Sequence, residues 1–121
     1  MTSTVILYHN PNCSKSRAAL LLLKVRNVDT KVIPYLTEPL GEEQIRNLKK
    51  KLAISSVREM MRSKDTLYSD LQLDQADEDT LIAAIAAHPI LIERPIVVFG
   101  EHAAIGRPLT NIEALLENHV S

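Results

Sequence analysis

One cysteine carries most of the chemistry that this sequence offers. Cys13 is the only cysteine among the 121 residues, and it lies between the turn-forming triplet Asn-Pro-Asn at 10–12 and a helix-forming run that starts at Ser14. At a helix start, a thiol sits beside free backbone N–H groups and the positive end of the helix dipole, and both lower its pKa. The sequence therefore predicts a reactive thiolate at Cys13.

The residues that follow predict an anion-binding site at the same place. Ser14, Lys15 and Ser16 would present consecutive backbone N–H groups and two hydroxyls to whatever approaches the sulfur. Lys15 and Arg17 add positive charge to this end of the helix. We therefore expect the nucleophile and an anion seat to coincide.

The alternative is that Cys13 is a small buried hydrophobic residue, which is the commonest fate of a free cysteine. The polar neighbours Asn12, Ser14 and Lys15 favour the reactive interpretation. Because Ser16 takes the second position of a C-x-x-C pair, a resolving thiol has to come from another molecule.

Composition limits the number of domains and the kinds of binding partner that this chain can have. The chain is 45% hydrophobic with a net charge of −1, which fits one globular domain over residues 1–121 and gives no footprint for nucleic acid or an anionic membrane. We find no signal peptide or membrane span, and a lone cysteine forms no internal disulfide, so we expect a cytoplasmic protein. His88, His102 and His119 lack metal-ligand spacing with one another and with Cys13, so we expect no metal and no bound cofactor.

The elements that must position these residues follow from hydrophobic periodicity and turn signals. Short β-rich runs flank a long, mostly amphipathic middle section, which predicts the order βαβ, several helices, then ββα. The predicted strands are 5–8, 31–35, 96–99 and 103–105. The predicted helices begin at Ser14, Glu42, Ser56, either Asp77 or Asp79, and Thr110.

Some local features are more specific. In the first helix, apolar residues recur at helical spacing at Ala18, Leu21, Leu22 and Val25. Pro34 places the second strand at a sheet edge or near its end. Capping boxes are predicted at 56–59 and 110–113.

Four stretches together resemble one known family, the glutaredoxin-dependent arsenate reductases. Residues 8–17 (YHNPNCSKSR) are similar to the family's active-site loop, 88–98 (HPILIERPIVV) to its second signature and 105–108 (IGRP) to its third. Residues 57–62 (VREMMR) fall where the family has an arginine-bearing helix. The resemblance covers nearly the whole chain, in register.

This resemblance implies an α/β, thioredoxin-like fold with a four-stranded mixed sheet and a helical insertion at about 41–90. It also implies that Cys13 is the nucleophile and that Arg62, Arg94 and Arg107 bind an oxyanion, a task to which flat guanidinium groups are suited. For any single arginine, a solvated surface position is the commoner outcome, and only the motif match favours a site. The resemblance further implies a cis bond before Pro95 and an influence of His9 on the thiol, although a histidine beside a turn is about as often a simple hydrogen-bonding surface residue.

The function implied is reduction of arsenate, or a similar oxyanion, with glutathione as co-substrate and glutaredoxin as partner, by a monomer. Two alternatives stay open. Spx-type regulators share the fold and bind RNA polymerase, but Ser16 and the three arginines disfavour that interpretation. A general glutathione-linked thiol oxidoreductase would use the same cysteine on another substrate.

Overall fold

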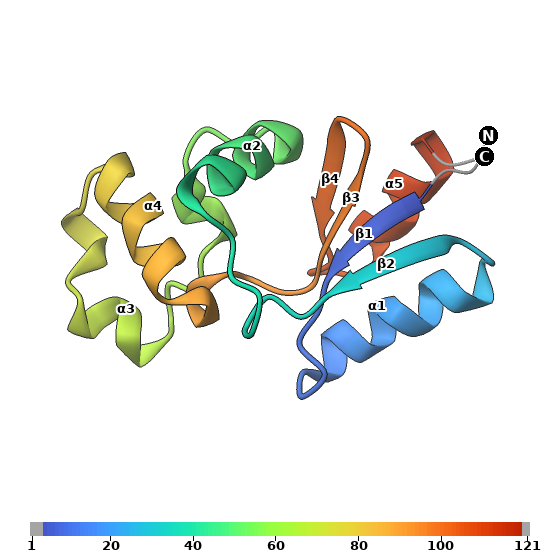
Figure 1. The fold of residues 1–121 in the computed structure, drawn as a ribbon, viewed down its shortest axis with the longest axis horizontal. Helices are drawn as coiled ribbons and strands as arrows, with labels where there is room; N and C mark the ends of the chain where they lie inside the picture. The colour runs from blue at the N-terminus through green and yellow to red at the C-terminus, as the bar shows by residue number, and fades with distance from the viewer. Residues whose placement is uncertain (1–3, 120–121) are drawn as a thin grey trace. The chain divides into compact units, whose positions relative to one another are not determined.

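The computed structural model describes residues 4–119, and side chains as far as residue 118. Its organising element is a four-stranded sheet built from both ends of the chain. The strands are β1 (Thr4–Tyr8), β2 (Asp29–Ile33), β3 (Ile96–Phe99) and β4 (His102–Ile105), in the order β2-β1-β3-β4. β1 and β2 are parallel and the other pairs are antiparallel (Figure 1). The predicted mixed α/β sheet is confirmed.

The chain divides into two compact units, each described here by itself. The first contains the sheet and runs up to Glu38 and again from Arg94, whereas the second is Pro39–Glu93. The single domain with an insertion at about 41–90 stays a prediction. No helix within residues 4–119 is long and apolar enough to cross a membrane.

The core of the first unit lies between the sheet and two helices, α1 (Ser14–Val25) and α5 (Thr110–His119). Val5 and Leu7 alternate toward this core from β1, as the pleat of a strand requires. Ile112, Leu115 and Leu116 are buried from α5, as the sequence predicted.

The buried face of α1 differs from the predicted one. Ser16, Ala19 and Leu23 are buried, whereas Leu21 is 62% and Val25 72% exposed. The four consecutive leucines at 20–23 place an apolar residue on nearly every side of the helix, so the sequence pattern does not show which side is buried. The buried side of α1 is instead the side that carries Ser16 at the start of the helix.

The predicted bounds of β2 and the predicted cap of α5 are wrong, whereas the start of α5 at Thr110 is confirmed. β2 begins at Asp29 and ends at Ile33, two residues earlier at each end than predicted. The carboxylate of Asp29 accepts a 2.7 Å hydrogen bond from the Thr4 hydroxyl. The place of β2 at the sheet edge, just before Pro34, is confirmed. Thr110 does not cap α5, because it already lies in the helix and the carbonyl of Leu109 accepts from the amide of Ile112.

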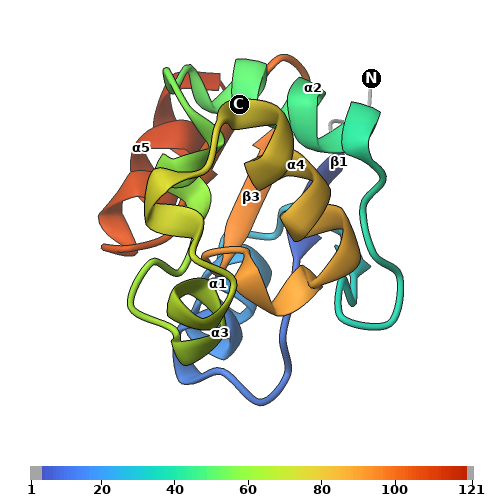
Figure 2. The same ribbon diagram turned by 90° about the vertical axis from the view of Figure 1, so that its left-hand side faces the viewer.

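The second unit is helical (Figure 2). Its α-helices are α2 (Glu42–Leu52), α3 (Thr66–Asp70) and α4 (Glu78–Ala87), with short 3-10 turns η1 (Val57–Met60), η2 (Leu73–Gln75) and η3 (Pro89–Leu91). The capping box at Ser56 is confirmed but opens only the single turn η1. Asp77, rather than Asp79, caps α4 by accepting from the amide of Thr80.

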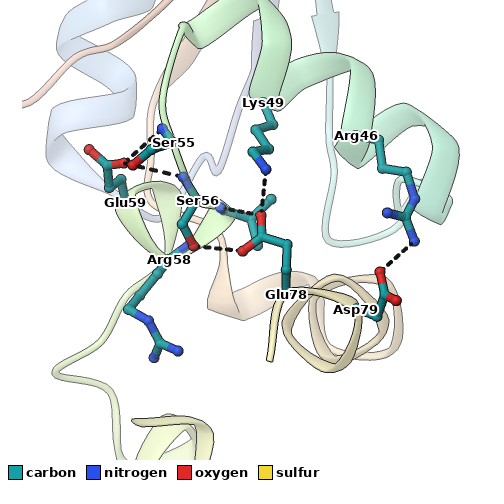
Figure 3. Close-up of polar contacts among 9 residues, drawn as sticks. Arg46, Lys49, Ser55, Ser56, Arg58, Glu59, Glu78 and Asp79 are labelled. Atoms are coloured by element: carbon teal, nitrogen blue, oxygen red, sulfur yellow. Dashed lines mark hydrogen bonds and ion pairs between the residues drawn. The ribbon is translucent and has the colours of Figure 1, made fainter. Parts of the chain in front are cut away.

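Glu78 links three elements of this unit (Figure 3). From the first turn of α4, its carboxylate accepts hydrogen bonds from the Ser56 hydroxyl at 2.7 Å and the Val57 amide at 2.9 Å, and pairs with Lys49 of α2 at 2.9 Å. Burial raises the pKa of Glu78, but these donors outweigh burial and lower it overall. The ionised carboxylate therefore stabilises the contact of α4 with α2 and η1.

We predict that Glu78→Gln lowers the free energy of unfolding by about 1–2 kcal/mol at neutral pH, because charge-assisted hydrogen bonds are lost. Since the native pKa of Glu78 is depressed, its contribution is present above the unfolded value of 4.5 and is lost as the pH falls through the native pKa. Urea unfolding at pH 7 and pH 3 measures both effects. Asp79→Asn, at an exposed neighbouring position, is the control, and equal losses in the two variants would contradict the prediction.

Candidate functional site

A tight turn joins the end of β1 to the start of α1 and sets the position of Cys13. The side-chain oxygen of Asn10 accepts from the amide of Asn12 at 3.0 Å, and the carbonyl of Asn10 accepts from the amide of Cys13 at 3.0 Å. Cys13 is the extended residue just before the helix, with φ −100° and ψ 122°. Its sulfur therefore stands at the open N-terminal turn of α1.

Ser16 holds this turn from within. It is fully buried, and its hydroxyl oxygen accepts from the amide of Asn10 at 3.0 Å and lies 2.7 Å from Nδ1 of His9. The prediction that the Ser16 hydroxyl faces an anion is therefore wrong, because the hydroxyl is committed to the turn. Ser14, by contrast, is exposed.

His9 and Arg17 complete the support of the turn. Arg17 donates from Nη1 to the carbonyl of Pro11 at 2.9 Å. Burial, and then the charge of Arg17, lower the pKa of His9, so its imidazole is neutral near pH 7. His9 contacts Ser16, which in turn bonds the loop that carries Cys13, and an influence of His9 on the thiol stays a prediction.

The groups beside the sulfur of Cys13 favour its ionised form. Burial raises the pKa of this thiol, but the amides of Ser16 and Lys15 and the guanidinium of Arg94 outweigh burial and lower the pKa below its ordinary value of 9.0. Nη2 of Arg107 lies 3.8 Å from the sulfur. The side chain is 8% exposed. The thiolate is thus stabilised by backbone dipoles and two guanidinium groups, in the direction that the sequence predicted.

Arg94 and Arg107 come from the two ends of the β3–β4 hairpin. Nε of Arg107 donates to the carbonyl of Arg94 at 2.6 Å, which fixes the two arginines side by side. The bond between Arg94 and Pro95 is cis, as the resemblance implied, and the bond between Arg107 and Pro108 is also cis. Neither Nε nor Nη1 of Arg94, both buried, has a hydrogen-bond partner within residues 4–119. Such N–H groups fit an incoming anion.

Arg62 belongs to the second unit and is held differently. Its amide donates to the carbonyl of Leu91 at 2.7 Å, and its guanidinium pairs with Asp65 at 3.2 Å. The structure therefore brings two of the three predicted arginines together with Cys13 inside one unit. A role of Arg62 as an oxyanion ligand stays a prediction.

The chain matches the model of the ArsC family over residues 8–115, which include the Cys13 turn, Arg94 and Arg107. The chain belongs to the ArsC family. An arsenate reductase of Neisseria meningitidis serogroup A is 51% identical over 112 residues, which are 91% of this chain and 96% of the relative. An arsenate reductase of Haemophilus influenzae is 44% identical over 115 residues, 93% of this chain and 99% of the relative.

Solved structures agree with this assignment. The arsenate reductase from Vibrio cholerae superposes with a TM-score of 0.89 at 44% identity, covering 93% of this chain and 98% of the other. The ArsC-family chain therefore has the thioredoxin-like fold that the sequence resemblance implied. Within its described residues, no cluster of three His, Cys, Asp or Glu side chains could hold a metal ion.

One site residue of this ArsC-family chain was not singled out from the sequence. A Cβ on Gly106 would lie 2.6 Å from Ile112 and 2.8 Å from the ring of Pro95, and the amide of Gly106 donates to the carbonyl of Pro95 at 2.8 Å. Gly106 thus allows the segment bearing Arg107 to approach the one bearing Arg94. The glycine directly before Arg107 was the available signal.

The pKa of the Cys13 thiol should lie below that of an ordinary thiol, and Arg94→Gln should raise it because a positive charge and a hydrogen-bond donor are removed. The rate of alkylation by iodoacetamide, measured from pH 4 to pH 10, gives the midpoint in each protein. Arg26→Gln, at the far end of α1, is the control and should leave the midpoint unchanged. A wild-type midpoint at the ordinary thiol value would contradict the prediction.

Proposed function

We propose that this protein reduces arsenate to arsenite, with the Cys13 thiolate as nucleophile. The observation that carries the proposal is the pair of buried, unpartnered N–H groups of Arg94 beside a thiol whose pKa is lowered. An oxyanion that accepts hydrogen bonds from Arg94 and Arg107 would lie next to the sulfur that attacks it. Relatives at 44–51% identity that bear the name arsenate reductase support this choice of oxyanion.

In the first step, the sulfur of Cys13 forms a bond to arsenic while one arsenate oxygen takes up protons and leaves as water. Arsenic stays in its +5 state, and the product is a Cys13 thiol-arsenate adduct. Negative charge is crowded onto the remaining oxygens as sulfur approaches. Guanidinium groups and amides already in position stabilise this charge without having to reorganise.

In the second step, glutathione supplies the electrons. Its sulfur bonds to the sulfur of Cys13 as the S–As bond breaks, and the bonding pair leaves with arsenic, which becomes arsenite in the +3 state. Two thiols have then become one mixed disulfide, which balances the two electrons gained by arsenic. A glutaredoxin thiolate attacks the glutathione sulfur, takes the glutathionyl group and releases Cys13 as thiolate.

An external reductant is required because Cys13 is the only cysteine of the chain. The hydroxyl of Ser16, at the place where a resolving thiol would stand, is bonded within the turn. The proposed cycle therefore belongs in a compartment rich in reduced glutathione, and we place the protein in the cytoplasm.

Cys13→Ser should abolish arsenate reduction in an assay that supplies glutathione, glutaredoxin and a system for regenerating them, because a serine hydroxyl is not ionised and forms no stable bond of this kind to arsenic. Circular dichroism should show an unchanged fold. Turnover that persists in this variant would end the proposal. Release of glutathione from glutathionylated substrates, with no dependence on arsenate, would instead favour a general thiol oxidoreductase.

Arg94→Ala should lower kcat/KM for arsenate by about 100-fold, the usual cost of removing one preorganised donor to a developing anion. Arg94→Lys should recover only part of the loss, because an ammonium group cannot reproduce the flat fork of the guanidinium. Arg26→Lys serves as the matched control. An unchanged kcat/KM in Arg94→Ala would remove this residue from the proposed site.

A further inference from the structure

The free edge of β2 is a surface that the proposed function does not use. β2 is the outermost strand on its side of the sheet (Figure 1), and no other strand within residues 4–119 pairs with it there. Val32, near the end of this edge, is 41% exposed although it is apolar. Open strand edges are templates for pairing with another strand unless something blocks them.

The register of β2 shows which backbone groups are open. The carbonyl of Ile33 accepts from the amide of His9, which follows β1, so Ile33 faces β1. Because backbone direction alternates along a strand, Asp29 and Lys31 also face β1 with their backbone groups, whereas Thr30 and Val32 face away from it. The backbone N–H and C=O groups of Thr30 and Val32 therefore point outward, away from the sheet, at its free edge.

A second copy of the same strand can pair with these groups around a two-fold axis. In a regular antiparallel ladder, the backbone groups of two opposite residues either both point to the partner strand or both point away from it. A residue can therefore lie opposite its own copy but not opposite a copy of its neighbour. The two-fold axis accordingly passes between the two copies of one residue, which we call the axis through that residue. There are five possible positions in β2, and the sequence eliminates four of them.

Axes through Asp29 or Lys31 place two identical charges directly opposite each other, which is unfavourable. Axes through Val32 or Ile33 place Pro34 of the second copy opposite Thr30 or Val32, and proline has no N–H to donate. One position is left, the axis through Thr30.

The axis through Thr30 makes the strand self-complementary. Asp29 then lies opposite Lys31 of the second copy, and Lys31 opposite its Asp29, so both ends carry an ion pair in the close, non-hydrogen-bonded geometry. The two Thr30 residues exchange two backbone hydrogen bonds. On the other face, the exposed Val32 lies opposite Val28 of the second copy. The Val28 carbonyl already accepts from the Thr30 hydroxyl at 3.0 Å, and its second lone pair can accept from the amide of Val32 of the second copy.

We propose that β2 is a self-association surface, through which two copies of this chain pair antiparallel about Thr30. The pairing extends each four-stranded sheet into one continuous eight-stranded sheet. Lys31 discourages promiscuous pairing because any strand without an acid at the matching position leaves its charge unpaired. The inference does not rest on the proposed function, and it proposes a dimer where the sequence resemblance implied a monomer.

Charge-swap variants test the register. Sedimentation equilibrium of the wild type from about 10 µM to about 1 mM should show a monomer–dimer equilibrium, as expected for a small interface. Asp29→Lys or Lys31→Glu alone should remain monomeric, because each places like charges opposite each other. An equimolar mixture of the two variants should regain dimer, since opposite charges again face each other at both ends. Asp70→Lys and Lys64→Glu, on exposed positions of the second unit, make the same charge changes and should behave as the wild type.

Cross-linking tests the same axis without relying on the charges. In a Cys13→Ser background, Thr30→Cys places two cysteines with Cα atoms about 5.5 Å apart, within the range of a disulfide, and mild oxidation should yield a covalent dimer. Val32→Cys lies away from its counterpart and should cross-link far less. A wild type that stays monomeric at the highest concentration, a mixture that gains no dimer, or equal cross-linking at the two positions would each overturn the proposal.

Discussion

Favourable interactions of the Ser16 and Lys15 amides with the sulfur of Cys13, which lower the pKa of the thiol, are what the site depends on. They exist because the turn after β1 delivers Cys13 to the start of α1 while Ser16 locks the first helical turn to the loop. Burial alone would leave the thiol protonated. The fold thus offsets the cost of burying a thiolate with backbone dipoles that need no rearrangement.

The guanidinium groups around the sulfur depend on a different part of the fold. Arg94 precedes β3 and Arg107 follows β4, so the hairpin brings together two residues that are 13 positions apart in the chain. Gly106 permits the close approach, and β3 is fixed against β1, the strand that leads to Cys13. A single sheet therefore sets both the nucleophile and its cationic surroundings.

Much of this arrangement follows from local sequence. The run 96–99 is β-branched and aromatic, and it forms β3 with the bounds expected. α2 also matches its prediction, since acidic residues begin it and lysines end it. The lowered pKa of the Cys13 thiol follows from a cysteine placed between a turn and a helix.

The remaining features depend on contacts between distant residues. α3 has only five residues and was not predicted, and it is held by the hydrogen bond of Arg58 to Tyr68. The inward hydroxyl of Ser16 depends on the exact path of the turn, which residue types alone do not specify. Likewise, a pattern of apolar residues in α1 did not reveal which side meets the sheet.

The unpartnered N–H groups of Arg94 have a thermodynamic consequence for the folded chain. Each buried donor without an acceptor costs about 1–3 kcal/mol, and the neighbouring charge of Arg107 adds repulsion. A protein optimised only for durability would carry an apolar residue at position 94. This protein instead keeps two unpaired donors where the proposed oxyanion would bind, so that some stability would be traded for binding.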